Sequence, residues 1–510
     1  MKRAFRGIVA AFILFSAAGA ACAQTAPIEF ASSGDAGFDA WRAGFAQRAL
    51  AQGRTTATIQ RVLGGLTPDP RVISADRRQP EFVSPVWDYV DRAVSQTRIT
   101  QGRARRAEHA ALFSAVEMRY GVDADIIAGI WAMETNFGSA PLPHNAAQAI
   151  ATLAYEGRRR AQFETYLLAL LEMVDRGYAG EAELRSSWAG ALGQPQFMPD
   201  VYLTLAADWD GDGKRDIWNN HGDIFASVAN YLAQRGWRRG EAVFDEVRLP
   251  ANFDYAAADT QMRPMNDWIA RGLTRADGGP WSDGARALNA QLFLPAGAQG
   301  PALLLYPNFQ VIKRYNNSDR YALSVAMLAR GMEGGASRLS TPWPTHLGSL
   351  NRDEIFELQT LLNAQGFSAG IADGQFGSNT RNAVRAFQQA RGLPADGFPT
   401  DALLRQARSG GTGATQTAAT QQAGTTIRSM QPIADPAEAE EPVGRSTLSV
   451  ARVRELQRLL RRLGFDPGPA DGAFGLRTSD AIRDFERSVG RRVTGSATQA
   501  VLNAARRAAR

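Results

Sequence analysis

A helical pattern of apolar residues runs through residues 123–138, which read DADIIAGIWAMETNFG. Ile126, Ile130, Met133 and Phe137 lie three or four positions apart, which is the spacing of one face of a helix. An aspartate begins this stretch and a glycine ends it, and both are typical of helix ends. The pattern therefore predicts a helix over 123–138 with one acidic residue, Glu134, near its C-terminal end.

Similar patterns continue over much of the chain. Helical spacings of apolar residues, with aromatic residues throughout, extend from about residue 35 to 335. The segment TPWPTH at 341–346 contains two closely spaced prolines, and proline interrupts helices. We therefore expect a helical domain over 35–335 and a boundary shortly after it.

An internal repeat follows this boundary. The segment ELQTLLNAQGFSAGIADGQFGSNTRNAVRAFQ begins at Glu357, and ELQRLLRRLGFDPGPADGAFGLRTSDAIRDFE begins 98 residues later, at Glu455. Val453, Leu456 and Leu460 share one helix face, and Thr478 after the Gly-rich turn is typical of a helix N-cap. We expect two small helical modules at 348–407 and 447–506. The alternative is a pair of duplicated helical hairpins without a ligand.

The segment between the modules, 408–446, is rich in Gly, Thr, Ala, Gln and Pro. This composition does not bury enough apolar surface to fold, so we expect a flexible linker. Two modules on a tether suit bivalent binding to a polymer.

The N-terminal residues are typical of an export signal. Lys2, Arg3 and Arg6 precede an apolar run over 7–19 that is too short to span a bilayer comfortably, and residues 21–23 form a small-x-small cleavage signal. We expect removal of residues 1–23 and a periplasmic location. The alternative is lipid attachment to Cys22, which would anchor the protein to a membrane, although glycine three residues earlier disfavours it.

Charge is distributed unevenly along the chain. The whole sequence carries a net charge of +6, whereas residues 451–510 alone contain 13 arginines and six acidic residues, a net of +7. Such a region is suited to an anionic partner. Because an exported protein does not meet nucleic acid, we expect an acidic wall polymer or a membrane surface. The alternative is a solvated basic surface.

Glu134 has two features that favour its protonated form. It lies beside apolar positions, where loss of water disfavours the charged carboxylate. It also lies in the last turn of the predicted helix, where the helix dipole is negative. Both features predict a raised pKa, as a general acid requires. The alternative is a surface or ion-paired glutamate.

Other catalytic chemistries lack their motifs. The four histidines (His109, His144, His221 and His346) do not have metal-ligand spacing, and neither G-x-S-x-G nor the phosphate-binding G-x-x-x-x-G-K-[ST] occurs. Cys22 is the only cysteine, so removal of the signal excludes a thiol nucleophile.

Two further stretches carry polar groups that indicate binding of a sugar and of a metal ion. Ser187, Gln194 and Gln196 lie in the loop SSWAGALGQPQF, where uncharged hydrogen-bonding groups suit sugar hydroxyls; the alternative is a loop held by local hydrogen bonds. The segment DWDGDGKRD that follows has the spacing of a calcium loop. Its oxygen donors suit Ca²⁺, and the alternative is an acidic turn. The expected ligands are Asp208, Asp210, Asp212, the Lys214 carbonyl, Asp216 and, beyond an Asn219 that replaces the usual glutamate, Asp223.

Each repeat resembles the small peptidoglycan-binding domain found at the ends of many wall hydrolases. The shared residues are ELQ-x-L-L, G-F and D-G-x-F-G-x-x-T, and the match covers nearly all of each module. The resemblance implies binding to glycan strands of the wall.

Residues from about 38 to 335 resemble the lytic murein transglycosylases of the B type. The matching stretches are YGVDADIIAGIWAMETNFG, SWAGALGQPQFMP with its calcium-type loop, and YPNFQVIKRYNNSDRYALSVAML. The resemblance implies a mainly α-helical, lysozyme-like α+β domain with a deep groove, and it places the catalytic role on Glu134. It also implies substrate-binding roles for Ser187, Gln196, Tyr315, Asn316 and, less closely matched, Arg159 and Arg160.

A lytic transglycosylase needs one protein carboxylate, whereas a glycosidase commonly needs two. The resemblance implies cleavage of the bond between N-acetylmuramic acid and N-acetylglucosamine with formation of a 1,6-anhydro ring, and no cofactor for the chemistry. Two alternatives stay open at this point. One is a hydrolytic muramidase with a second acid such as Asp200 or Asp208, and the other is a wall-binding scaffold without activity.

Overall fold

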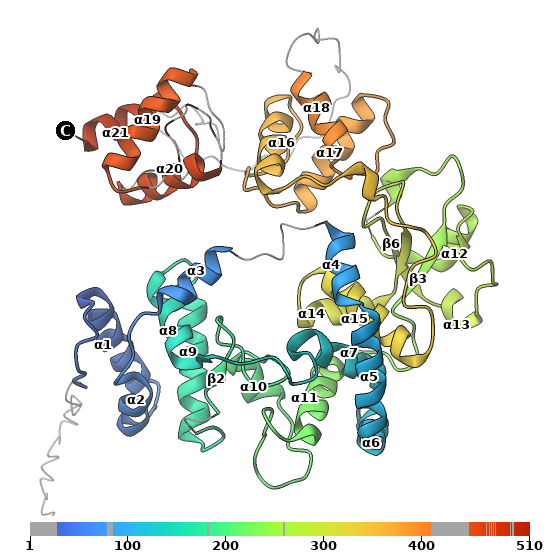
Figure 1. The fold of residues 1–510 in the computed structure, drawn as a ribbon, viewed down its shortest axis with the longest axis horizontal. Helices are drawn as coiled ribbons and strands as arrows, with labels where there is room; N and C mark the ends of the chain where they lie inside the picture. Colours follow the sequence, from blue (N-terminus) through green and yellow to red (C-terminus); the bar gives the residue numbers. More distant parts are fainter. Residues whose placement is uncertain are drawn as a thin grey trace, which may run out of the picture.

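The computed structural model describes residues 28–78, 85–180, 183–258, 261–409, 448–465 and, with short gaps, 467–509. The expected export signal and nearly all of the expected linker lie outside these residues. Figure 1 shows a helical body, an antiparallel sheet beside it and two small helical modules above. The prediction of a mainly α-helical chain with a little β structure is confirmed.

The first half of the helical body packs around a buried arginine. The guanidinium of Arg42 is 2% exposed and donates hydrogen bonds to the carbonyls of Leu63, Leu66 and Ala31. This arrangement satisfies a charge that would otherwise be costly to bury, and it fastens the first helix to the loop after the second. The helices of this half are α1 (Ala36–Ala51), α2 (Thr56–Leu63), α3 (Pro70–Arg78), α8 (Ala146–Glu156) and α9 (Arg160–Asp175).

Helix α7 (Ala124–Thr135) lies at the centre of the second half. Ile127, Ile130 and Trp131 are almost completely buried, as expected for a helix that is apolar on all sides. A Cβ atom added at Gly129 would lie 3.0 Å from the carbonyl oxygen of Val325, so this glycine permits close packing against α15. The surrounding helices are α4 (Val86–Ala93), α5 (Gln96–Glu108), α6 (Ala110–Tyr120), α10 (Pro199–Leu205), α11 (His221–Gln234), α14 (Pro307–Tyr315) and α15 (Asp319–Glu333).

The observed α7 is shorter than the predicted helix over 123–138. Asn136 and Phe137 have φ angles of 48° and 58°, so the chain leaves the helix in a left-handed turn before it reaches Gly138. At the other end, the side chain of Asp123 makes no capping hydrogen bond. Instead, the carboxylate of Glu117 accepts a hydrogen bond from the amide of Ala124 at 3.1 Å.

A five-stranded antiparallel sheet with its own core lies beside the helical body. Its strand order is β4-β6-β7-β3-β5, and Trp268 at its centre donates to the carbonyl of Ala290. Tyr306 leaves this sheet with its amide bonded to the Val243 carbonyl, and proline then begins α14. The sheet therefore sets the position of α14. Its elements are β3 (Phe244–Arg248), β4 (Arg263–Pro264), α12 (Met265–Ala270), β5 (Thr274–Arg275), α13 (Asp283–Arg286), β6 (Asn289–Phe293) and β7 (Ala302–Leu305).

Each C-terminal module contains three helices around a small apolar core. Module 1 comprises α16 (Arg352–Ala364), α17 (Ser378–Ala390) and α18 (Asp401–Ser409), and module 2 comprises α19 (Val450–Arg462), α20 (Leu476–Ser488) and α21 (Gln499–Ala508). The expected N-cap at Thr478 is wrong, because α20 begins two residues earlier. The Thr478 hydroxyl is buried and bonds to the Pro467 carbonyl instead.

Both modules make contacts with their neighbours. The amide of Ala298 donates to Asp396 of module 1 at 2.8 Å, and Phe398 packs into the core of the helical body. Module 2 contacts module 1 through the rings of Phe474 and Phe356, whose centroids are 5.9 Å apart. Along the described residues, no helix combines the length and the apolar character that crossing a bilayer requires.

Candidate active site

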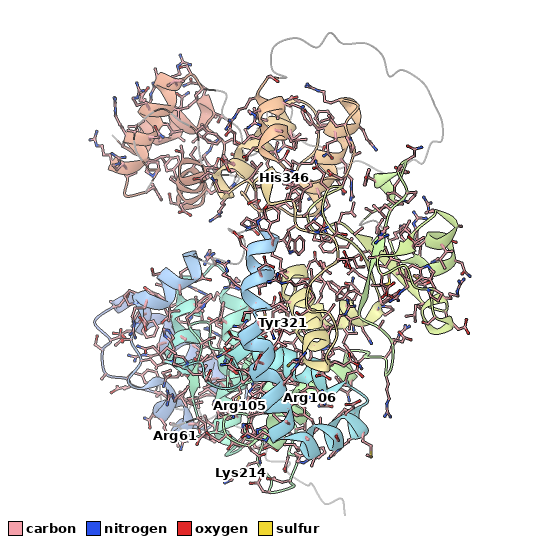
Figure 2. The ribbon with its side chains drawn as sticks, turned by 45° about the vertical axis from the view of Figure 1, so that its right-hand side comes forward. Arg61, Arg105, Arg106, Lys214, Tyr321 and His346 are labelled. Atoms are coloured by element: carbon pink, nitrogen blue, oxygen red, sulfur yellow. The ribbon has the colours of Figure 1, made fainter. Side chains whose placement is uncertain are left out.

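The carboxyl group of Glu134 lies in the last turn of α7 and is partly buried. The hydroxyl of Tyr321, on α15, donates a hydrogen bond to its Oε1 at 2.6 Å. Tyr321 is itself only 3% exposed and lies inside the helical body (Figure 2). The close packing of α7 on α15 therefore fixes the distance between the carboxyl group and its hydrogen-bond donor.

A second tyrosine, the partly buried Tyr315, lies near the same carboxylate. Burial raises the pKa of Tyr315 and of Tyr321 well above the ordinary range, and the charge of Glu134 raises both further. Within the described part of the chain, Glu134 is the one carboxylate that has this effect on the two groups. Both hydroxyls therefore stay protonated, and they surround a single carboxylate.

Backbone strain is concentrated around Glu134. Among the described residues other than glycine, Asn136, Phe137 and Gln196 have positive φ angles, and no others do. Two of them directly follow the last turn of α7, which carries Glu134. Such conformations cost about 1–3 kcal/mol each and gather at functional sites.

The loop over residues 187–197 brings several predicted residues together. The Ser187 hydroxyl accepts a hydrogen bond from the Ala191 amide at 3.3 Å, and the Gln196 side chain donates to the carbonyls of Ala191 and Gly193. The Tyr315 hydroxyl donates to the carbonyl of Pro195 at 2.6 Å. The structure thus joins Ser187, Gln196 and Tyr315 to the surroundings of Glu134.

Asn316 follows Tyr315 at the C-cap of α14, so it leaves the helix at the same edge of the site. Its carbonyl accepts a hydrogen bond from the amide of Ser318 at 2.7 Å. This tight turn leads directly into α15 and to Tyr321.

The structure corrects the interpretation of Gln194. Its side-chain oxygen accepts a hydrogen bond from the Trp131 indole at 2.6 Å, and its amide nitrogen donates to the Trp218 carbonyl at 2.7 Å. The Thr135 hydroxyl also donates to the Gln194 carbonyl. Both ends of the side chain are therefore used inside the protein, and Gln194 positions the end of α7.

A cavity of about 370 Å³ lies beside the end of α7. Thr135 and Gly138 line one side, and Glu183, Arg185 and Trp218 line the other. Sequence reasoning did not identify these last three residues. It also missed Tyr321, for which the only sequence signal was its place in the third matching stretch.

Arg159 and Arg160 lie at the junction of α8 and α9. Arg159 pairs with Asp76 at 2.9 Å, and Arg160 donates to the carbonyls of Ala154 and Tyr155. The hydrogen bonds found among the described residues do not connect this pair to Glu134. The structure therefore does not bring the two arginines into the cluster around the carboxylate.

Three of the expected metal ligands converge. Carboxylate oxygens of Asp208, Asp210 and Asp212 lie within 4.8 Å of one another, and all three side chains are accessible to solvent. Three hard oxygen donors on a tight loop fit Ca²⁺. The carboxylates of Asp216 and Asp223 accept hydrogen bonds from backbone amides of the loop itself. Asp216 accepts from the Trp218 amide, and Asp223 accepts from the amides of Trp209 and Asp216.

Comparisons with known proteins match both the helical body and the two modules. The family model described as "Transglycosylase SLT domain" matches residues 37–330, and the model described as "Putative peptidoglycan binding domain" matches 351–406 and 449–505. The membrane-bound lytic murein transglycosylase B of Escherichia coli is 28% identical over 295 residues, which is 56% of this chain and 77% of that protein.

Two solved structures are also similar. SltB3 from Pseudomonas aeruginosa, in complex with NAG-anhNAM-pentapeptide, is 47% identical with a TM-score of 0.70; the match covers 73% of this chain and 99% of that chain. Slt35 from Escherichia coli, in complex with calcium, is 26% identical with a TM-score of 0.50; the match covers 57% and 92% of the two chains.

Proposed function

The chain belongs to the transglycosylase SLT family and is a lytic transglycosylase of peptidoglycan, and from this premise we propose that Glu134 acts as its single general acid and base. The observation that carries the proposal is the hydrogen bond from the buried Tyr321 hydroxyl to Glu134 Oε1. It fixes the position of the carboxyl group at the end of α7.

In the first step, Glu134 protonates the oxygen of the glycosidic bond between N-acetylmuramic acid and N-acetylglucosamine. That bond breaks, and N-acetylglucosamine leaves with the proton. The 2-acetamido group of the muramyl residue stabilises the positive charge that develops at C1. This step requires a protonated Glu134, and that state stays a prediction.

In the second step, the Glu134 carboxylate removes the proton from the C6 hydroxyl of the same muramyl residue. The C6 oxygen attacks C1 and closes the 1,6-anhydro ring, and Glu134 regains its proton. No water is consumed. Because the nucleophile belongs to the substrate, its proximity replaces a second protein carboxylate.

The residues around Glu134 orient the sugar chain. We assign substrate contacts to Ser187, Gln196, Tyr315 and Asn316, which lie on the loop and the helix end beside the carboxylate. The resemblance also assigns substrate binding to Arg159 and Arg160; their hydrogen bonds in the described residues go to Asp76 and to the carbonyls of Ala154 and Tyr155, so we assign them no contact beside Glu134.

The calcium-type loop has a structural role in this proposal. Asp208, Asp210 and Asp212 with the Lys214 carbonyl would hold Ca²⁺, and Asp216 and Asp223 would hold the loop backbone. The bound ion would neutralise the repulsion between the three carboxylates. The loop is connected to the surroundings of Glu134 through Gln194, whose backbone amide donates a hydrogen bond to the Ile217 carbonyl at 2.8 Å. We further propose that the protein acts in the periplasm after removal of residues 1–23.

Mass spectrometry of the muropeptides released from isolated wall sacculi tests the mechanism. A transglycosylase releases anhydro ends, which are lighter by one water than the ends that hydrolysis produces. We expect anhydro ends from the wild type and none from Glu134→Gln, which should still sediment with sacculi. A matched control is Glu164→Gln, because Glu164 pairs with Arg48 in the contact between α1 and α9.

Each alternative function predicts a different result. Hydrolysed ends from the wild type would replace the proposal with a muramidase. A wild type that binds sacculi and releases nothing would identify a scaffold.

A further inference from the structure

The two C-terminal modules share a fold but differ in charge. Residues 451–510 contain 13 arginines and six acidic residues, a net of +7. The equivalent residues 353–412, which lie 98 positions earlier, contain five arginines and six acidic residues, a net of −1. One chain therefore carries a basic and a nearly neutral version of the same module.

Hydrogen bonds show that the two modules correspond residue by residue. Glu357 and Arg408 form two parallel bonds of 2.8 Å in module 1, and Glu455 and Arg506 form the same two bonds in module 2. Both pairs tie the first helix of a module to its third. The difference in charge therefore lies on a common scaffold.

The extra charge forms an exposed face on α19. We call it the arginine face, and it consists of Arg452, Arg458, Arg461 and Arg462. It points away from Val453, Leu456 and Leu460, which are buried in the core of module 2. At the equivalent positions, module 1 carries Glu354, Thr360, Asn363 and Ala364.

Internal ion pairs do not neutralise the arginine face. Arg452 donates to the side-chain oxygen of Gln499, and Arg461 donates to the carbonyl of Gly468. Both partners are neutral. Glu455, the acidic residue of the same helix, is paired with Arg506. Within the described residues, no direct ion pair joins the face to a carboxylate, although Arg452 and Arg458 help Arg506 to lower the pKa of Glu455.

The features that the modules share lie elsewhere. In both, a buried glutamine on the first helix accepts a hydrogen bond from a glycine of the Gly-rich turn, at 2.8 Å from Gly374 to Gln359 and 2.9 Å from Gly472 to Gln457. Module 1 has the Gly-rich turn but not the arginine face, so a ligand that binds the turn in both modules does not need the face. We therefore expect the arginine face to bind a different ligand from the one bound at the turn.

We propose that the arginine face docks module 2 on an anionic phospholipid surface. Arginine side chains bind phosphate oxygens in pairs of hydrogen bonds, and a cluster of basic residues is attracted to negatively charged lipid headgroups. Val450, at the start of the same helix, is 62% exposed and adds an apolar group for contact with a membrane. The face stays exposed while module 2 contacts module 1, so wall and membrane can be held together.

An exchange of residues between the modules tests this proposal. The variant Arg452→Glu/Arg458→Thr/Arg461→Asn/Arg462→Ala gives α19 the residues that α16 carries. We expect it to fold, because Asn363 bonds to the carbonyl of Gly370, the equivalent of Gly468. The chain from residue 24 is mixed with vesicles of phosphatidylglycerol and phosphatidylcholine, or of phosphatidylcholine alone, and the bound fraction is measured by sedimentation.

The wild type is expected to bind the anionic vesicles, more weakly as salt rises, and not the neutral ones. The four replacements should lower this binding at least tenfold and leave sedimentation with sacculi unchanged. The reverse variant, Glu354→Arg/Thr360→Arg/Asn363→Arg/Ala364→Arg, should strengthen it. Vesicle binding that is absent, or that does not respond to either exchange, would overturn the proposal. Loss of sacculus binding alone would identify the wall as the ligand of this face and would also overturn it.

Discussion

Replacing Asp123 with asparagine is expected to stabilise the protein above pH 6 and to have no such effect near pH 4. Asp123 precedes α7, at the opposite end of this helix from Glu134, beside a cavity of about 460 Å³ with many acidic residues. Burial, the largest cause, and the charges of Glu117, Asp125 and Glu333 together raise its pKa to about 6. Arg239 opposes the shift.

The sign of the effect follows from this raised pKa. Below about pH 4, Asp123 is protonated in the folded and in the unfolded protein, so it contributes no penalty. Between about pH 4 and 6 the unfolded chain has lost this proton and the folded protein still holds it, so the free energy of unfolding falls over this range and stays lowered above it. A shift from 3.8 to about 6 corresponds to about 3 kcal/mol, and solvent screening of a partly exposed group reduces this to about 1.5 kcal/mol.

Urea unfolding followed by tryptophan fluorescence is a suitable assay. All ten tryptophans precede residue 344, so the signal reports on the catalytic part and not on the two modules. We expect Asp123→Asn to raise the free energy of unfolding by about 1.5 kcal/mol at pH 8 relative to the wild type. Asp91→Asn, which removes an exposed charge from α4, is the matched control. An equal gain at pH 4 and pH 8, or a loss at pH 8, would refute the electrostatic explanation.

Three further predictions concern the hydrogen bond to Glu134, the packing of α7 on α15 and the calcium-type loop. If Glu134 is the proposed general acid and base, Tyr321→Phe should lower kcat about 10- to 100-fold in a muropeptide release assay and leave folding intact, because it removes only the hydrogen-bond donor to Glu134. Gly129→Ala should lower the free energy of unfolding, measured by urea unfolding, by about 1–3 kcal/mol, because its Cβ would lie 3.0 Å from the Val325 carbonyl oxygen. Gly44→Ala is the control: its Cβ would have its nearest contact at 3.5 Å, so it should stabilise α1 slightly. Chelation of calcium should lower the Tm of the wild type, with about 2.7 kcal/mol lost if the ion had been present at 100 times its Kd, and Asp210→Asn should remove this response.

Periodicity in the sequence was sufficient to predict the elements that bury a regular apolar face. It located α7 and placed Glu134 in its last turn, and the repeat located both modules. These features depend on residues close together in the chain. The end of α7 could not be predicted to the residue, because Asn136 and Phe137 adopt left-handed conformations that neither residue type requires.

The partners of the site residues depend on packing between distant segments. Tyr321 is 187 positions from Glu134, and only the close approach of α15 to α7 brings its hydroxyl to the carboxylate. Gln194 was predicted from its chemistry to suit sugar hydroxyls, and the structure uses both of its polar ends on the protein. A polar side chain in a loop thus indicates hydrogen bonding, but the partner follows from the fold.

The strained residues around Glu134 provide information that the sequence alone did not contain. Glycine at Asn136, Phe137 or Gln196 would relieve the left-handed backbone at little steric cost, yet each position carries a larger side chain. The strained backbone lies in the loop over 187–197 and at the end of α7. Gln194 connects these two segments by hydrogen bonds with Trp131 and Thr135. The proposed mechanism requires a rigid site, because in it Glu134 reaches first the glycosidic oxygen and then the C6 hydroxyl from nearly the same position. The strain, the two tyrosines beside Glu134 and the single carboxylate therefore support the proposed mechanism.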